Sequence, residues 1–196
     1  MAEVLLVHHV QGLTDGVLAF AEQLRGGGHT VHTPDLYGGA TFTVMSEGFA
    51  HKSAIGEEAL AAGLADVLTG LPDALVYAGI SWGVPKVQQL AQTRSGARGA
   101  LLYEACIPIT GEWAFGPWPT SVPVQIHGME QDEFFGLEGD IDAAREIVAT
   151  VGPEVGELFV YPGDAHLFLD SSLPSYDADA AALVVARSLA FLDRVG

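Results

Sequence analysis

Short apolar runs alternate along the chain with longer segments in which apolar residues recur every three or four positions. The runs are rich in Val, Leu, Ile and Ala, which is typical of strands that are buried on both faces of a parallel sheet. We therefore expect strands at residues 4–8, 29–33, 74–80, 99–103, 122–127 and 157–161.

The segments between these runs carry the periodicity of helices. One helix of about a dozen residues is expected after a cap at Thr14 or Asp15, ending at residues 26–28. The other expected helices are 46–70 in two pieces that break near Gly56, then 83–94, 142–151 and 177–194. This alternation predicts an α/β fold: a mostly parallel sheet of about six strands with helices on both faces. No repeat or linker divides the chain, so one domain spanning residues 1–196 is expected.

Composition narrows the classes of function. The formal net charge is −17, from 25 acidic and 8 basic residues, and a surface this acidic disfavours nucleic acid and anionic lipid. Cys106 is the single cysteine, which excludes an internal disulfide framework and fits a reducing compartment. The start shows no signal-peptide pattern, and no apolar stretch is long enough to span a bilayer. We expect a cytoplasmic monomer or homodimer that acts on a small molecule, with no membrane or nucleic-acid partner.

The run at 74–80 leads into Gly79-Ile80-Ser81-Trp82-Gly83, and a helical segment follows at once. In a nucleophile elbow, a sharp turn between strand and helix exposes a serine hydroxyl above the sheet, and small residues two before and two after it prevent collisions. Chance alone gives about 0.13 matches to Gly-x-Ser-x-Gly in a chain of this composition. The strand and helix on either side therefore carry the prediction that Ser81 is a nucleophile, against the alternative of an ordinary turn serine.

A serine nucleophile needs a base and an acid that orients the base. Both are expected in loops after later strands, in the chain order Ser, acid, His. His166 follows the last predicted strand and is the one histidine after position 127, so it is the predicted base. Three carboxylates, Glu130, Asp132 and Glu133, follow the strand before it. We favour Asp132 as the acid, with the other two as alternatives.

Several residues near the same edge of the sheet are candidates for the substrate pocket: His9, Gln11, Glu104 and Trp113. The backbone N–H groups of Val10 and Trp82 are the expected oxyanion hole. Phe115 and Trp118 lie in the same long loop as Trp113. These aromatic side chains either wall the pocket or pack the loop onto the sheet. Glu104 has a capping or surface role as its alternative.

Two other sites are possible on residue type alone. His8 and His9 are adjacent, and neighbouring strand residues point to opposite faces, so joint metal binding is not expected. Cys106 follows a strand, where a lone cysteine is more often a buried apolar thiol than a nucleophile. No metal and no cofactor are predicted.

Four segments together resemble the dienelactone hydrolase family of α/β-hydrolases. They are Pro34-Asp35-Leu36-Tyr37, the elbow at 79–83, Gln131-Asp132-Glu133-Phe134-Phe135, and Tyr161-Pro162-Gly163 followed by His166. The resemblance implies an α/β-hydrolase fold without a large cap domain, and it implies Asp132 as the acid.

Three positions depart from the family pattern. Ser81 stands where the founding enzymes have a cysteine, and His9 stands where they have a glutamate after the first strand. Asp170 replaces the arginine, four residues after the histidine, that holds the substrate carboxylate in those enzymes. A carboxylate-bearing dienelactone is therefore not the expected substrate.

The leading interpretation is a serine hydrolase of a small neutral or apolar ester, thioester or lactone. A non-catalytic small-molecule binding protein on the same fold is the second. A peptidase or dehalogenase is a third, although a dehalogenase usually needs a carboxylate at the elbow, where this chain has Ser81.

Overall fold

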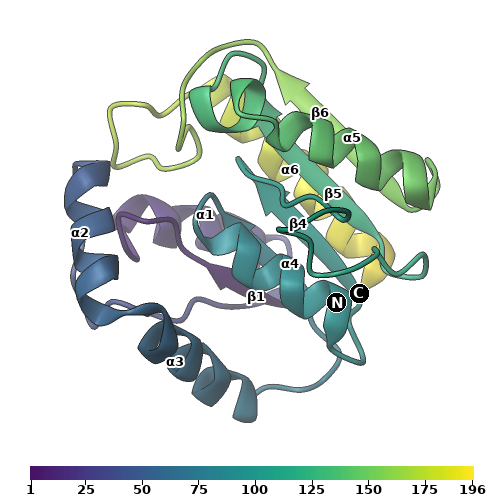
Figure 1. Cartoon of the computed structure of the whole chain (residues 1–196), viewed down its shortest axis with the longest axis horizontal. Helices are drawn as coiled ribbons and strands as arrows, with labels where there is room; N and C mark the ends of the chain where they lie inside the picture. Colours follow the sequence, from purple (N-terminus) through teal and green to yellow (C-terminus); the bar gives the residue numbers. More distant parts are fainter.

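All six strands form one sheet in the computed structural model, which describes residues 1–196. The strands are β1 (Glu3–Val7), β2 (Thr30–His32), β3 (Val76–Ile80), β4 (Gly99–Tyr103), β5 (Val124–Met129) and β6 (Gly156–Tyr161). Their order is β2-β1-β3-β4-β5-β6, and every neighbouring pair is parallel (Figure 1). The predicted parallel α/β fold is thus confirmed.

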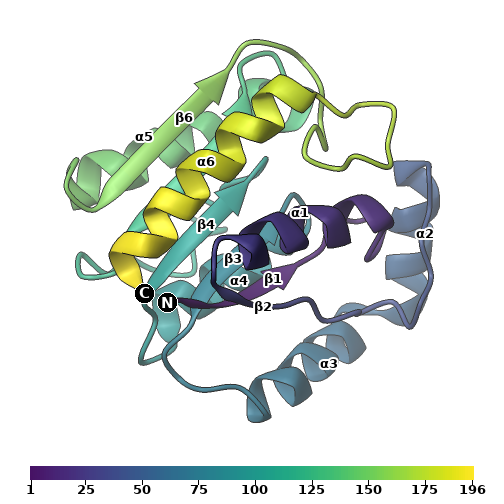
Figure 2. The same cartoon turned by 180° about the vertical axis from the view of Figure 1, so that it is seen from behind.

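Helices cover both faces of this sheet. They are α1 (Asp15–Gly26), α2 (Met45–Ile55), α3 (Glu57–Thr69), α4 (Gly83–Thr93), α5 (Asp140–Val151) and α6 (Ala178–Val195), with a short π-helical turn η1 (Glu133–Leu137). Helices α1 and α6 lie together on one face, and α3, α4 and α5 lie on the other (Figures 1 and 2). No helix of the chain combines the length and apolarity that crossing a membrane requires.

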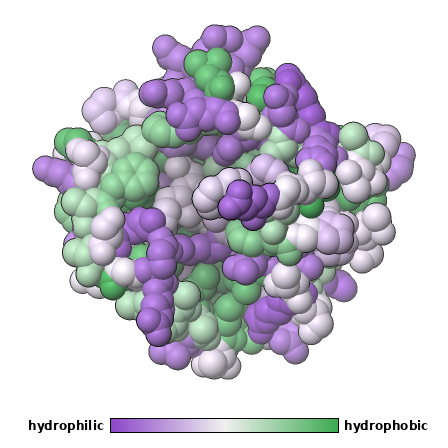
Figure 3. Space-filling view, viewed as in Figure 1, coloured by the Kyte–Doolittle hydropathy of each residue, from purple (hydrophilic) through white to green (hydrophobic).

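The alternation of side chains along each strand feeds two separate cores. In β1, Val4 and Leu6 pack into the core under α1 and α6, whereas Leu5 and Val7 pack into the core under α4 and α5. Burial on both faces explains why the central strands read as continuous apolar runs. On the outer surface, hydrophobic residues are dispersed among hydrophilic ones on the face that Figure 3 shows.

Local chemistry sets where the elements begin and end. The Thr14 side chain caps α1 by accepting from the Val17 N–H, and Gly56, with φ of +86°, separates α2 from α3 as predicted. The expected strand at 122–127 is shifted to Val124–Met129, because Pro123 has no N–H to donate to the ladder. The turn η1 was not predicted.

The strand order reverses at β1, which lies between β2 and β3 although β2 precedes β3 in sequence. Such a reversal opens a crevice at the carboxyl ends of the strands, where α/β folds bind their ligands. The loops after β1, β3, β4, β5 and β6 all meet at this edge. No cap domain is inserted between the strands.

Candidate active site

Ser81 lies in a tight turn between β3 and α4 and has a positive φ of +48°. Two glycines make the turn possible by allowing the backbone to approach its neighbours closely. A Cβ atom at Gly83 would lie 2.5 Å from the Val7 carbonyl oxygen, and one at Gly79 would lie 2.6 Å from Val87 Cγ2. The Ser81 N–H donates to the Tyr103 carbonyl over 2.8 Å, which fixes the turn to β4. These contacts give the local geometry of a nucleophile elbow.

The three residues of the predicted triad come together at the sheet edge. Ser81 Oγ lies 2.8 Å from His166 Nε2, and His166 Nδ1 lies 2.7 Å from Asp132 Oδ2. An ionised Asp132 accepts from Nδ1–H, so Nε2 is left to accept the Ser81 hydroxyl proton. The chain order and the hydrogen bonds are those of a serine, base and acid arrangement.

Asp132 is the carboxylate that reaches the imidazole. Its side chain is buried, and its second oxygen, Oδ1, accepts from the Phe134 N–H over 2.9 Å at the start of η1. The alternatives, Glu130 and Glu133, are exposed and make no bond to His166. Asp132 is therefore held in orientation from both sides.

Burial and the neighbouring carboxylates have opposite effects on the pKa of His166. Burial lowers the pKa of the imidazole, but the hydrogen bond to Asp132 and the charges of Glu104, Asp132 and Asp140 raise the pKa above its ordinary value of 6.5. The Phe134 ring packs against the imidazole with its centroid 4.6 Å away. The site thus favours the imidazolium that forms when Ser81 loses its proton.

The predicted oxyanion donors have free N–H groups. Val10 and Trp82 lie outside helices and strands, and neither backbone N–H donates to an acceptor within the protein. Trp82 immediately precedes α4, so its N–H also lies at the positive end of that helix.

A cavity of about 200 Å³ opens at Ser81 and His166. Its apolar walls come from four parts of the chain, and the side chains are Met45, Phe49, Trp82, Pro85, Ile107 and Phe134. Three carboxylates, Glu104, Glu138 and Asp140, also line it, and no Lys or Arg does. Burial raises the pKa of Asp140 to about 6 although the Cys106 N–H donates to it. The cavity is therefore apolar with an acidic rim.

Of the four predicted pocket residues, Glu104 lines the cavity at Ser81 and Trp113 lines a neighbouring one, and the prediction is corrected for His9 and Gln11. Neither lines the cavity at Ser81. His9 is fully buried, with Nε2 bonded to Asp170 Oδ2 over 2.8 Å and Nδ1 accepting from the Gln11 N–H over 3.2 Å. The Gln11 amide donates to the Phe42 carbonyl over 2.9 Å. Both side chains are used to hold neighbouring loops, so neither faces a substrate.

His9 and Asp170, two of the residues that differ from the family pattern, contact each other. Asp170 accepts hydrogen bonds from Thr14, His9 and Ser172. Burial raises the pKa of Asp170, but these hydrogen bonds have the larger effect together and lower the pKa to about 2. A glutamate and an arginine in the family are thus replaced by a histidine and an aspartate that form one buried pair. The carboxylate of Asp170 is used in this internal contact.

The neighbouring His8 is also fully engaged. Its Nδ1 bonds to the His9 carbonyl over 2.7 Å, its Nε2 accepts from the Leu36 N–H, and burial lowers its pKa to about 4. All four ring nitrogens of His8 and His9 therefore have partners. A metal ion could bind these two residues together only if it displaced those hydrogen bonds.

The long loop between β4 and β5 has two roles. Trp113 is 78% exposed and lines, with Phe115, a neighbouring cavity of about 560 Å³ rather than the one at Ser81. The two cavities share Pro85, Ile107, Glu138 and Asp140. Trp118 instead packs the loop, since it is buried and donates to the Val122 carbonyl. Trp113 therefore borders an extension of the site.

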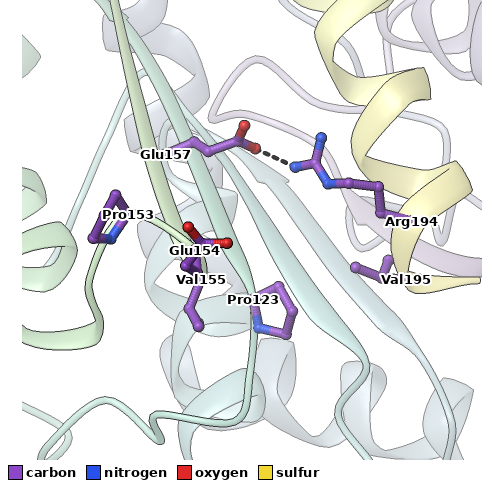
Figure 4. A pocket seen from close by; sticks show the side chains of 7 residues that line it. All are labelled: Pro123, Pro153, Glu154, Val155, Glu157, Arg194 and Val195. Atoms are coloured by element: carbon purple, nitrogen blue, oxygen red, sulfur yellow. Dashed lines mark hydrogen bonds and ion pairs between the residues drawn. The ribbon is translucent and has the colours of Figure 1, made fainter.

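A separate depression of about 370 Å³ lies at the amino ends of β5 and β6, away from Ser81. Figure 4 shows its side chains, among them Pro123 and the ion pair between Glu157 and Arg194. It contains no nucleophile and no histidine. This depression therefore lacks the nucleophile and the base that the predicted reaction needs.

Some residues that shape the cavity were not predicted. Phe134 follows the acid directly, and its place in the 131–135 segment was an available signal. Met45 and Phe49 come from α2, whose only buried residue is Gly48. Such a helix has no apolar face in sequence, so its contribution to the site had no signal.

The parallel sheet and the turn at Ser81 have the arrangement of the α/β-hydrolase fold, and the chain is similar to solved structures with that fold. A Klebsiella pneumoniae protein assigned as a dienelactone hydrolase has a TM-score of 0.75 at 18% identity, covering 99% of this chain and 87% of that one. A dienelactone hydrolase-like promiscuous phosphotriesterase from metagenomic libraries gives 0.74 at 16%, covering 100% and 87%. A cold-adapted esterase from an Arctic intertidal metagenomic library gives 0.54 at 18%, covering 99% and 83%. At these identities the likeness shows the fold.

The family is indicated by the sequence itself. Residues 117–196 match the model of the Dienelactone hydrolase family, and this confirms the predicted resemblance. The matched region contains Asp132 and His166 and begins after the elbow. A search of curated proteins finds no match.

Proposed function

We propose that the chain is a serine hydrolase that cleaves a small neutral or apolar ester, thioester or lactone through an acyl-enzyme on Ser81. The observation that carries the proposal is the continuous hydrogen-bond chain from Ser81 through His166 to Asp132, at 2.8 and 2.7 Å. A serine hydroxyl is a poor nucleophile at neutral pH unless such a base removes its proton.

The proposed reaction has two steps. His166 takes the proton from Ser81 Oγ as that oxygen attacks the carbonyl carbon, and Asp132 supports the imidazolium. The N–H groups of Val10 and Trp82 donate to the oxyanion, and His166 then protonates the leaving oxygen or sulfur. Water, deprotonated by His166, attacks the acyl-enzyme and releases the acid. No step needs a metal ion or a cofactor.

The substrate class follows from the cavity walls. Apolar side chains suit a small acyl or alcohol group, and the three carboxylates repel an anionic substrate. Lys86, which follows the elbow, lies over the Trp82 ring at 4.4 Å and does not line the cavity. A dienelactone carboxylate would therefore find no cationic partner there.

Covalent labelling separates this proposal from a non-catalytic binding protein on the same fold. A fluorophosphonate probe should label the folded protein at Ser81, as identified by mass spectrometry of the peptides, because the probe reacts with activated serines. The variant Ser81→Ala should remain unlabelled. Absence of labelling in the folded wild-type protein would favour the binding function.

The pH dependence of turnover should report His166. The base must be neutral to accept the Ser81 proton, so kcat/KM should fall as the pH drops through the pKa of His166. Because that pKa is raised, the half-maximal point of the acidic limb should lie above pH 6.5. A stopped-flow or plate assay with p-nitrophenyl acetate between pH 5 and 9 measures this limb. An acidic limb centred below pH 6 would contradict the assignment.

A further inference from the structure

Glu104 is a buried carboxylate that the proposed mechanism does not use. It directly follows β4, has no exposed surface, and lines the cavity at Ser81. Its backbone has a positive φ of +63°, and its N–H donates to the His127 carbonyl over 2.7 Å, which ties the end of β4 to β5. A side chain of this type at a strained, buried position needs specific partners.

The partners of this carboxylate lie immediately after His166. Glu104 Oε2 accepts from the Leu167 N–H over 2.8 Å, and Oε1 accepts from the Leu169 N–H over 3.3 Å. Leu167 itself has a positive φ of +62°. Two strained residues on different segments are thus joined by a charged hydrogen bond, and one of them is covalently next to the proposed base.

His166 is consequently held from two neighbouring strands. Asp132, after β5, bonds to its ring, and Glu104, after β4, bonds to the backbone that follows it. Without an acceptor at Glu104, the Leu167 and Leu169 N–H groups would be buried with no partner, which is unfavourable for each group. The loop would then relax, and the His166 ring would move relative to Ser81.

We propose that Glu104 is the positioning residue of this site: it holds the loop that carries His166 and stabilises the imidazolium formed during acyl transfer. This inference rests on the proposed function. The charged groups that face Glu104 are His166 and Asp132, and those that face His166 are Asp132, Glu104 and Asp140. Burial raises the pKa of Glu104 to about 7, and the charge of His166 opposes that rise.

Two substitutions separate the geometric role from the electrostatic one. Glu104→Gln keeps one oxygen that accepts from the Leu167 N–H, and it removes both the charge and the acceptor of the longer bond from the Leu169 N–H. We expect it to retain kcat within about threefold and to move the acidic limb of kcat/KM to lower pH by about half a unit or more. Glu104→Ala removes both acceptors, and kcat should fall about 10- to 100-fold with little change in KM.

Glu130→Gln is the matched control, because Glu130 is an exposed carboxylate at the end of the next strand. It should leave kcat and the acidic limb unchanged. Circular dichroism and thermal unfolding of each variant identify loss of fold. If Glu104→Ala is unstable, the Glu104→Gln titration still decides the proposal.

NMR titration of the His166 ring gives a readout that does not depend on turnover. Its pKa should be lower in Glu104→Gln than in the wild type or in Glu130→Gln. One outcome is that the wild type hydrolyses no ester while the His166 pKa is still lower in Glu104→Gln. That result would contradict the proposed hydrolase function but would support the interaction between Glu104 and His166. If the wild type is active and Glu104→Gln changes neither the limb nor the ring pKa, the proposal for Glu104 is overturned.

Discussion

Replacing Ser81 with alanine is expected to lower kcat for p-nitrophenyl acetate by a factor of about 10³ or more. The variant lacks the oxygen that lies 2.8 Å from His166 Nε2, so no acyl-enzyme can form at this position. His166→Ala should cause a loss of similar size, and the double variant should lose little more, because groups that act as a unit are not additive. Initial rates with purified, folded variants measure this.

Ser95→Ala is the matched control, since Ser95 is an exposed serine outside the site. Its kcat should equal that of the wild type. Wild-type turnover by Ser81→Ala would mean that another group performs the chemistry. Cys106 is a poor substitute, because it is fully buried and burial raises the pKa of its thiol well above the ordinary value.

Replacing Asp170 with alanine is expected to lower the free energy of unfolding by about 3 kcal/mol, or somewhat more. The change removes the shared acceptor of His9, Thr14 and Ser172 and leaves buried donors without partners. Asp170→Asn should cost less, because one oxygen remains. Urea unfolding at pH 7 measures the difference, with Asp164→Ala, an exposed carboxylate in the same loop, as the control. An unchanged midpoint in Asp170→Ala would show that the buried pair contributes nothing to stability.

The contribution of Asp170 to the free energy of unfolding should decrease as the pH falls. The folded state favours the ionised form of Asp170, since its pKa is lowered to about 2 from an ordinary 3.8. Its contribution to stability is therefore fully present above pH 3.8 and is lost as the pH falls from there toward 2. The stability gap between the wild type and Asp170→Ala should shrink between pH 7 and pH 3. A gap that widens at low pH would contradict the assigned shift.

The fold was predictable because its central strands are buried on both faces and its edge strand β6 is still largely apolar. The runs at 99–103 and 157–161 contain almost only apolar residues, and the strands were found there within one residue. The elbow was equally readable, since the steric demand that selects Gly79 and Gly83 acts within five residues. Asp132 and His166 could be expected near Ser81 because parallel strands bring their following loops to one edge.

Side-chain direction could not be predicted in the same way. His9 follows the first strand at the correct edge, but its ring turns away toward Asp170, a partner 161 residues later. That contact depends on packing between α1 and the loop after β6, which leaves no local trace in the sequence. The π-helical turn at Glu133–Leu137 likewise depends on how the chain leaves Asp132.

Three non-glycine residues of the chain have positive φ, namely Ser81, Glu104 and Leu167. Ser81 and Glu104 line one cavity, and Leu167 is bonded to Glu104 through its N–H. Conformations of this type cost about 1–3 kcal/mol per residue, so the backbone geometry around Ser81 and His166 lowers the stability of the folded chain. Selection for heat resistance alone would act at Ser81, where glycine relaxes the backbone, whereas glycine at Glu104 or Leu167 would remove buried contacts. Thermostable variants obtained in that way would lose activity, so efforts to stabilise this chain should leave the three residues unchanged.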